Sequence, residues 1–331
     1  MRPLDFLAIG DIVTEPFIRL TDATVAQAAD GTQMLSMRFG DKIPYESSTD
    51  MPAVGNASNA AVAVARLGLS SALRAYVGDD VQGTQCLARL VEEKVDTEYM
   101  VTEPGSKTNH HYVLWYGNDR TILVKHEAFN YDVPTIANPP KWVYLSSLAA
   151  NTLAYHHAIA EMLSYHPDTK LAFQPGTFQM SLGVEALRPI YERTDFFVVN
   201  VEEAERILGL PEGQDISLLL ESVHALGPKV VAITDGTKGA YAYDGTRKMR
   251  VPMYPDIRGP YERTGAGDAF ASTTVAALAL GKPLEEALLW GPINSMSVVQ
   301  DVGAQRGLLT LDTLLDYLVK APPEYAVTDL S

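Results

Sequence analysis

The sequence predicts an α/β fold in which a mostly parallel sheet is covered by helices on both faces, with a second, smaller β-sheet beside it. The first observation is that apolar, strand-like runs alternate with helical segments along most of the 331 residues, which is typical of a parallel sheet. The second is that residues 11–52 and 108–126 break this alternation. Their short alternating runs, interrupted by Gly and Pro, predict exposed antiparallel strands.

Strands of the main sheet are expected where short apolar runs occur. These are residues 4–9, 72–77, 142–146, 171–174, 196–200 and 230–234. Helices are expected where apolar side chains follow helical spacing, at residues 59–67, 83–95, 153–165, 201–208, 217–226, 267–280, 284–300 and 311–319. Turn residues at 117–119 predict a hairpin in the second β segment. After Pro322-Pro323 we expect a loosely held tail.

This organisation predicts two domains that are interleaved in the sequence. Residues 1–10, 53–107 and 127–331 would form the α/β catalytic domain. Residues 11–52 and 108–126 would form an inserted β-sheet. Such a sheet could act as a lid that excludes water from a reaction site.

The charge balance limits the kinds of partner. A formal net charge of -15 argues against a nucleic-acid-binding surface and against binding to an anionic membrane, although a phosphorylated ligand needs only a local positive site. Cys86 is the only cysteine, so no disulfide forms within the chain, and we expect a cytoplasmic protein in which Cys86 is a small buried side chain. The N-terminal residues lack the layout of a signal peptide, and no stretch of 18 apolar residues predicts a membrane span.

Residues 263–270, with the sequence Arg-Thr-Gly-Ala-Gly-Asp-Ala-Phe, are the most informative segment. The small residues Gly265, Ala266 and Gly267 let a ligand approach the backbone at a helix N-terminus, where N–H groups are unpaired and the dipole is positive. Asp268 in the first turn could accept a proton from an attacking hydroxyl. An anion hole beside a carboxylate base is what phosphoryl transfer requires. The alternative is an ordinary helix start with Asp268 as a capping acid.

Asn200 and Glu203 follow an apolar strand, at the strand end where open α/β sheets bind ligands. Three residues apart, they share one helix face and could hold Mg²⁺ through its waters. The alternative is that Asn200 caps the helix and Glu203 is an acid of its first turn.

A third candidate site follows the strand at residues 230–234. Gly236 and Gly239 could allow close approach of a nucleotide, with Thr234 near its phosphates, although an ordinary hairpin explains the same residues. Asn59 begins an apolar helix and could contact a polyol or simply cap the helix. Residues His110 and His111 would point to opposite faces of a strand and lack zinc-ligand spacing. No P-loop motif is present.

Taken together and in this order, these motifs resemble those of the ribokinase-like (PfkB) family of small-molecule kinases. The resemblance runs from about residue 4 to residue 318, and its most specific part is the segment 264–268. It implies a three-layer α/β/α sandwich with a mostly parallel central sheet and a small β-sheet lid. The segments that resemble family motifs are 55–59 with 65–68, 78–83, 200–203, 234–239, 264–268 and 303–304.

The resemblance implies an ATP- and Mg²⁺-dependent kinase and gives roles to individual residues. Asp268 would be the base, and the backbone of Gly265, Ala266 and Gly267 would be the anion hole for the γ-phosphoryl group. The residues implied to organise Mg²⁺ are Asn200 and Glu203. Those implied near ATP are Thr234, Gly236, Gly239, Asn294, Gly303 and Ala304. Those implied near the acceptor are Asp11, Glu15, Gly55 and Asn59. A homodimer formed through the lid is also implied.

Three departures from the family pattern bear on these roles. Val54 stands where relatives have the first glycine of a Gly-Gly hinge, and Glu15 stands where many have Asp. Residues 262–264 replace an Asp-Thr-Thr-like run that helps to bind K⁺, so an effect of K⁺ stays open. Arg263 adds a positive charge beside the anion hole, where it could contact ATP or a phosphate already on the substrate.

The leading functional hypothesis is a kinase acting on a primary hydroxyl of a sugar. The second is a nucleoside kinase that phosphorylates a 5′-hydroxyl, because residues 174–178 and the aromatic residues Tyr112, Trp115 and Tyr116 could stack a base. The third is a non-catalytic binding scaffold, which the presence of both a base and an anion hole disfavours.

Overall fold

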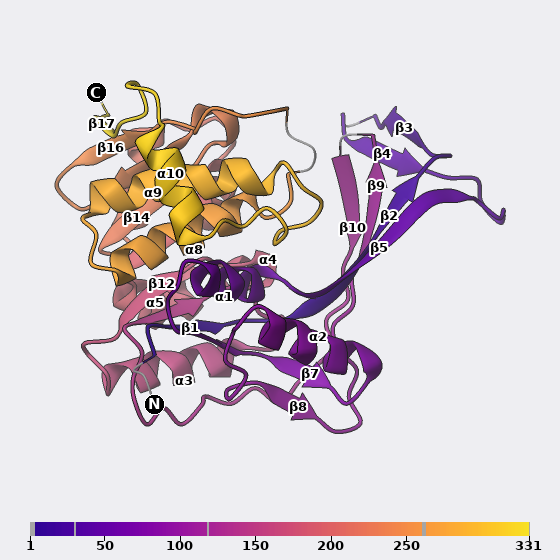
Figure 1. The fold of residues 1–331 in the computed structure, drawn as a ribbon, viewed down its shortest axis with the longest axis horizontal. Coiled ribbons are helices and arrows are strands. Elements are labelled where there is room, and N and C mark those ends of the chain that lie inside the picture. Colours follow the sequence, from indigo (N-terminus) through magenta and orange to yellow (C-terminus); the bar gives the residue numbers. More distant parts are fainter. Residues whose placement is uncertain (1–3, 30, 118, 260–262, 331) are drawn as a thin grey trace.

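The computed structural model describes residues 4–29, 31–117, 119–259 and 263–330, and its main body is built on a nine-stranded sheet (Figure 1). Six consecutive strands of this sheet run parallel to one another, whereas the three strands at one edge pair in antiparallel orientation. The mostly parallel sheet is thus confirmed. In sheet order the strands are β17 (Thr328–Asp329), β16 (Lys248–Val251), β15 (Ala240–Tyr243), β14 (Val230–Thr234), β13 (Phe196–Asn200), β12 (Lys170–Phe173), β11 (Trp142–Leu145), β1 (Phe6–Ile9) and β6 (Ser71–Arg74).

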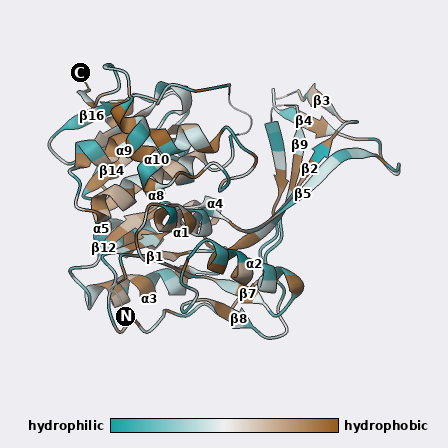
Figure 2. Ribbon diagram, in the orientation of Figure 1, coloured by the Kyte–Doolittle hydropathy of each residue, from teal (hydrophilic) through white to brown (hydrophobic). Residues whose placement is uncertain are grey.

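Helices cover both faces of this sheet because side chains alternate along each strand. In β1, Phe6 and Ala8 enter one apolar core while Leu7 and Ile9 enter the other, as expected for a pleated strand. The three-layer α/β/α sandwich is therefore confirmed, and Figure 2 shows apolar residues concentrated in its strands and helices. The first core lies against α1 (Asn56–Arg66), α2 (Val81–Glu92), α8 (Ala266–Ala279), α9 (Leu284–Val298) and α10 (Leu311–Val319). The second lies against α3 (Leu153–Ser164), α5 (Val184–Arg193), α6 (Val201–Leu208) and α7 (Ile216–His224).

A smaller four-stranded sheet extends away from the main body (Figure 1). Its strands are β10 (Asp119–Leu123), β9 (Tyr112–Tyr116), β2 (Val13–Leu20) and β5 (Tyr45–Val54), in that order. We call it the small sheet. Strands β9 and β10 form the expected hairpin, with Tyr116 opposite Asp119. The short hairpin of β3 (Thr24–Gln27) and β4 (Gln33–Ser36) lies at the far end of the small sheet (Figure 1).

The remaining elements include two departures from the sequence expectations. The single strand expected at 72–77 is divided: β6 pairs with β1, and β7 (Tyr76–Gly78) pairs with β8 (Val101–Glu103). The tail expected to be loose is held in place, because Tyr325 is buried with its hydroxyl donating to the Leu289 carbonyl and β17 pairs with β16. Cys86 is fully buried in α2, as expected. In the described part of the chain, no helix is long and apolar enough to cross a membrane.

Candidate active site

The start of α8 is shaped by Gly265, the N-cap residue. Its φ is 82°, in the left-handed region, and a Cβ there would lie 2.3 Å from the Ala304 Cβ. Glycine meets both constraints because it has no side chain. The first bond of the helix joins the Ala269 N–H to the Gly265 carbonyl at 2.9 Å, so the N–H groups before Ala269 lie outside the helical ladder. These donors and the positive end of the helix dipole favour an anion at this point.

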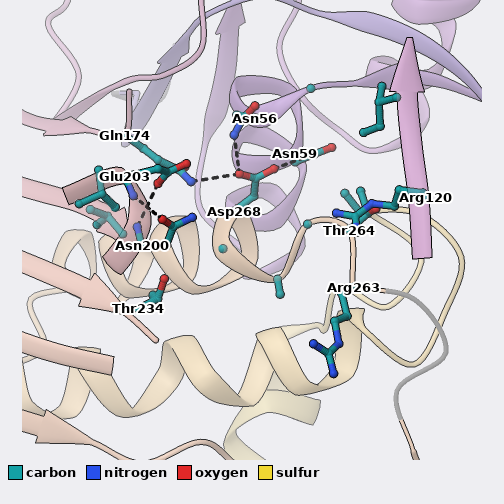
Figure 3. Close-up of a pocket in the computed structure, with 18 of the residues that line it drawn as sticks. Asn56, Asn59, Arg120, Gln174, Asn200, Glu203, Thr234, Arg263, Thr264 and Asp268 are labelled. Carbon is teal, nitrogen blue, oxygen red and sulfur yellow. Dashed lines mark hydrogen bonds between the residues drawn. The ribbon is translucent and has the colours of Figure 1, made fainter. Parts of the chain in front are cut away.

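Asp268 lies in the first turn of α8 and is held by three side-chain amides from other elements. The Asn56 and Asn59 amides, both on α1, donate to its carboxylate at 2.8 and 2.9 Å. The Gln174 amide, just after β12, donates at 3.1 Å. Figure 3 shows these donors converging on Asp268. The arrangement fixes the carboxylate's position at the carboxyl end of the parallel strands.

Two of these amides are themselves fixed by buried neighbours. The Gln305 amide donates to Asn59 Oδ1 at 3.1 Å, and the Tyr144 hydroxyl donates to Gln174 Oε1. Each carbonyl oxygen is thereby occupied, so the NH₂ groups of Asn59 and Gln174 are turned toward the carboxylate.

Burial raises the pKa of Asp268 above the usual range of an aspartate. The three amide donors act in the opposite direction because they stabilise the charged form, while the negative charge of Glu15 adds to the increase. A carboxylate with a raised pKa is a stronger base than a free aspartate, which is the property that proton abstraction needs.

Asn200 and Glu203 form a reciprocal capping box where β13 leads into α6. The Glu203 N–H donates to Asn200 Oδ1 at 2.7 Å, and the Asn200 N–H donates to Glu203 Oε2 at 2.9 Å. The helix cap considered as the alternative is therefore present. Burial raises the pKa of Glu203, and the nearby charge of Asp268 adds to this effect.

The same two residues suit a hydrated magnesium ion. The capping bond to Glu203 uses one carboxylate oxygen, and a carboxylate has a second oxygen for a metal-bound water. The described residues contain no group of three or more His, Cys, Asp or Glu side chains that would form a complete cage. Mg²⁺ often binds through one or two carboxylates, waters and substrate phosphates, which fits Asn200 and Glu203.

One cavity of about 380 Å³ brings most of the predicted residues together (Figure 3). We call it the central cavity. It contains the start of α8 with Asp268, the pair Asn200 and Glu203, and the nearby Arg263. Its lining residues are Glu15, Gly55, Asn56, Asn59, Arg120, Ile122, Gln174, Val198, Val199, Asn200, Glu203, Thr234, Arg263, Thr264, Gly265, Ala266, Gly267, Asp268 and Ala304.

The residues expected near a nucleotide are only partly brought together. Gly236 and Gly239 line a small cavity of about 120 Å³ next to the central one, and Thr234 lines both. Asn294 instead lies fully buried between helices, where its amide donates to Thr273 Oγ1 at 2.7 Å. Its carbonyl oxygen accepts the Leu309 N–H at 3.0 Å. These bonds give Asn294 a structural role in this conformation. Gly303 lies beside Met51 of the small sheet, and its neighbour Ala304 lines the central cavity.

A third space of about 370 Å³, the adjoining cavity, continues from the central one. The two share Glu15, Gly55, Asn56 and Ile122. The expected acceptor residue Asp11 also lines the adjoining cavity. Its full lining is Asp11, Val13, Glu15, Gly55, Asn56, His111, Ile122, Val124, His126, Ser147, Thr177 and Phe178. Thr177 and Phe178 begin the short helix α4 (Thr177–Leu182).

The junction between the small sheet and α1 is conformationally restricted. Gly55 has φ 104°, and a Cβ there would lie 2.8 Å from the Asp11 carbonyl. Two residues earlier, Ala53 has φ 59°, which is unusual for a residue with a side chain. The Ala53 carbonyl accepts hydrogen bonds from Ser58 and Gln305. Val54 is buried at this junction. These contacts hold the segment in one conformation.

Several lining residues have a place in the site that the sequence analysis did not assign to them. Asn56 and Gln174 bind Asp268, and their signal was available: Asn56 begins the same helix as Asn59, and Gln174 ends a predicted strand. Arg120 reaches the central cavity from β10, beside Thr264 (Figure 3), and no local pattern indicates this. Glu262, on which part of the K⁺ expectation rested, lies outside the described residues.

The sequence over most of the chain defines it as a small-molecule phosphotransferase. Residues 22–311 match the pfkB family of carbohydrate kinases. The chain belongs to this family, whose members transfer a phosphoryl group to an alcohol.

Relatives in the family are named for different activities. The chain is 30% identical to a ribokinase of Bacillus subtilis, over 80% of this chain and 87% of that protein. It is 26% identical to a nucleoside kinase of Methanocaldococcus jannaschii, over 80% of this chain and 85% of that protein. The solved structure of an Arabidopsis thaliana ribokinase in complex with ribose and ATP matches with a TM-score of 0.79 at 19% identity, covering 96% of this chain and 99% of that one.

Proposed function

We propose that this protein transfers the γ-phosphoryl group of ATP to a primary hydroxyl of a sugar, with Asp268 as the general base. The observation that carries the proposal is the carboxylate of Asp268, buried and oriented by three amides at the N-terminus of α8. A base and a set of backbone donors thereby face one cavity. Phosphoryl transfer depends on this combination of positioning and charge stabilisation.

In the central cavity, one group of residues acts on the acceptor hydroxyl and another stabilises the transferring phosphoryl group. The acceptor hydroxyl loses its proton to Asp268, and its oxygen then attacks the γ-phosphorus as the bond to the ADP oxygen breaks. Backbone N–H groups of Gly265, Ala266 and Gly267 stabilise the charge on the transferring group. Arg263 lines the same cavity and adds a positive charge there.

Asn200 and Glu203 would hold magnesium through its waters at the phosphate side of the cavity. When bound, the ion neutralises phosphate charge during transfer. On the nucleotide side, Gly236 and Gly239 border the small cavity, where they would lie next to ATP, and a side chain is absent from the open space beside Gly236. We make no assignment for K⁺.

The proposal is tested by measuring ADP release from Mg-ATP with a panel of acceptors, with and without K⁺. The panel contains ribose, fructose, 2-keto-3-deoxygluconate, fructose 6-phosphate, adenosine, inosine and cytidine, and Asp268→Asn serves as the control. We expect turnover with a sugar that is lost in the variant. Full activity in the variant would remove Asp268 from the mechanism.

A nucleoside kinase is the second candidate, and a specific observation favours it. Ile122, Val124 and Phe178 give the adjoining cavity an apolar wall that suits a nucleobase. The aromatic residue Trp115 is not available for this purpose, since it is buried with Arg19 stacked on its ring at 4.5 Å. Turnover of adenosine, inosine or cytidine in place of sugars, reduced by Phe178→Ala, would select this candidate.

We further propose a homodimer formed through the small sheet. Large apolar side chains are exposed on its outer hairpin and the following loop, among them Val25, Met34 and Phe39, and a second copy would cover them. Light scattering on the purified protein is expected to give twice the mass of the chain, and Phe39→Asp to give the monomer. A wild-type monomer at micromolar concentration would contradict the proposal.

A further inference from the structure

Two histidines that the catalytic proposal does not use face the adjoining cavity. His111 lies just before β9 and His126 just after β10, so the two ends of one hairpin bring them together. Their ring centroids are 5.1 Å apart, and both line the cavity that continues from Asp268. A molecule that reaches from Asp268 into the adjoining cavity would meet both rings.

Each imidazole is oriented by a carboxylate that lines the same cavity. His111 Nδ1 lies 3.2 Å from Glu15 Oε1, and His126 Nδ1 lies 2.9 Å from Asp11 Oδ2. An ionised carboxylate only accepts hydrogen bonds, so each Nδ1 carries the proton. In the neutral ring the other nitrogen, Nε2, is then an acceptor.

His111 Nε2 is a buried polar atom that has no hydrogen-bond partner among the described residues. The residue is only 9% exposed. A buried acceptor left without a donor costs free energy. His111 lines the adjoining cavity, so a small movement of its ring would let a molecule bound there supply the donor.

The polar groups that line the adjoining cavity share one property, which is that they accept hydrogen bonds. Asp11, Glu15 and the two Nε2 atoms all accept hydrogen bonds, and no Lys or Arg is among the described residues that line this cavity. The hydroxyl of Tyr131 donates to Asp11 Oδ1 at 2.8 Å, which leaves Asp11 as a fixed acceptor. A phosphate group here would meet two carboxylates with no Lys or Arg among the lining residues to offset their charge, whereas sugar hydroxyls would find acceptors.

We propose that His111 and His126 are specificity-determining residues that accept hydrogen bonds through Nε2 from hydroxyl or amino groups of an uncharged, unphosphorylated sugar or nucleoside. This inference rests on the proposed kinase function, since it names the class of acceptor for the same reaction. Glu15 and Asp11 act through the histidines as positioning residues. The two arginines of the central cavity, Arg120 and Arg263, would lie on the side that binds the phosphates of ATP.

Calorimetric titration in the presence of Mg²⁺ and a non-hydrolysable ATP analogue tests the inference without turnover. The ligands are ribose, fructose, adenosine, cytidine and fructose 6-phosphate. We expect a neutral ligand to bind at least ~10-fold more tightly than fructose 6-phosphate, and His111→Phe or His126→Phe to weaken it by roughly 5- to 10-fold, the range for one hydrogen bond. His111→Gln, which can restore an acceptor oxygen, should recover part of the affinity.

His110→Phe is the matched control, because His110 Nε2 is likewise buried without a partner among the described residues, but His110 packs against Tyr112 and is not among the cavity residues. It should leave the Kd unchanged, and thermal unfolding checks that each variant is folded. Tighter binding of fructose 6-phosphate, an unchanged Kd in both His→Phe variants, or no binding by any neutral ligand would overturn the inference. Histidine-dependent binding without ADP release would instead overturn the kinase proposal alone.

Discussion

Two opposing influences act on the pKa of the Asp268 carboxyl group. Burial and the charge of Glu15 raise its pKa, and the amides of Asn56, Asn59 and Gln174 lower it. The balance keeps the carboxyl oriented and leaves it more basic than a free aspartate. Neither influence could be predicted from residues 263–270 alone, because Glu15 and the three amides come from distant parts of the chain.

The first prediction concerns pH and follows from the raised pKa of Asp268. A general base must be ionised, so kcat/KM should rise with pH as Asp268 loses its proton, at a pH above the usual range of an aspartate. Glu15→Gln removes a negative charge and should move this rise to lower pH. Gln174→Met removes a donor to the carboxylate and should move it to higher pH.

The pair of variants supplies its own control because the two shifts have opposite signs. The measurement is the pH profile of kcat/KM for each protein, with the acceptor identified by the panel. Shifts in the same direction would show that another group controls the profile.

Among the structural elements, α8 depends most on its N-cap residue, Gly265. Gly265→Ala would combine the strain of a positive φ with a contact at 2.3 Å to Ala304. We predict a loss of about 1–3 kcal/mol in the free energy of unfolding. We also predict a fall of at least ~10-fold in kcat, because the anion-binding N–H groups move.

Gly281→Ala is the control for backbone strain. Gly281 has φ 80° just after α8, but a Cβ there meets nothing within 4 Å. Gly281→Ala should lower the free energy of unfolding by about 1–2 kcal/mol because of the left-handed backbone alone, and it should leave kcat unchanged. Urea unfolding and steady-state rates separate the two effects. Equal losses of kcat in both variants would contradict the role given to Gly265.

Elements with strong apolar runs could be predicted closely from the sequence. The strands Phe196–Asn200 and Val230–Thr234 and the helices Val201–Leu208 and Leu311–Val319 have the expected bounds. The hairpin of β3 and β4 agrees with the exposed antiparallel strands expected within residues 11–52, since all but one of its strand residues are exposed, but its bounds were not predicted. Helix α5 was missed because Pro189 lies inside it and Pro usually disfavours a helix interior.

At the scale of the whole molecule, Arg66 connects three parts of the chain to the site. Its guanidinium forms a paired contact with Glu93 at 2.8 and 2.6 Å. It also donates to the carbonyls of Gln305 and Leu308 at 2.8 and 2.9 Å. Gln305 in turn orients Asn59. Arg66 therefore supports the loop that helps to position Asp268.

We predict that Arg66→Met lowers the free energy of unfolding by about 2–4 kcal/mol, because it leaves a mostly buried Glu93 without its main partner. The pKa of Glu93 is lowered overall: burial would raise it, but Arg66 and Arg89 outweigh burial. The stability that Glu93 gives is thus present at neutral pH and lost as pH falls through its folded-state pKa. The loss in Arg66→Met should shrink accordingly in acid.

Arg89→Met tests whether the contacts of Arg66 with the Gln305 and Leu308 carbonyls contribute to the free energy of unfolding. Arg89 also pairs with Glu93 but is more exposed, and its other recorded partner is Glu92 on the same helix. Arg89→Met should lower the free energy of unfolding by less than about 1 kcal/mol. Urea unfolding at neutral and acidic pH gives both values, and an equal cost for the two variants would contradict this account.

The sandwich and the motifs at the strand ends could be predicted because each depends on a local run of residues. The hydrogen bonds of Asn56 and Gln174 to Asp268, the placement of Arg120 in the same cavity, and the pairing of His111 with Glu15 could not. These contacts join segments that are far apart in sequence, and their geometry is set by the packing of helices and by the placement of the small sheet. The position of Asn294 in the core, where it lines none of the three cavities, could not be predicted from the sequence for the same reason.

The central claim is that Asp268 removes the acceptor proton during phosphoryl transfer. The most direct test is a rapid-quench, single-turnover measurement with γ-labelled ATP and saturating acceptor, on the wild type and Asp268→Asn, after titration has shown that both bind ATP. We predict that transfer is slowed at least ~10²-fold in the variant, the usual effect of losing a general base, with ATP affinity retained. Transfer at a similar rate in both proteins would contradict the claim.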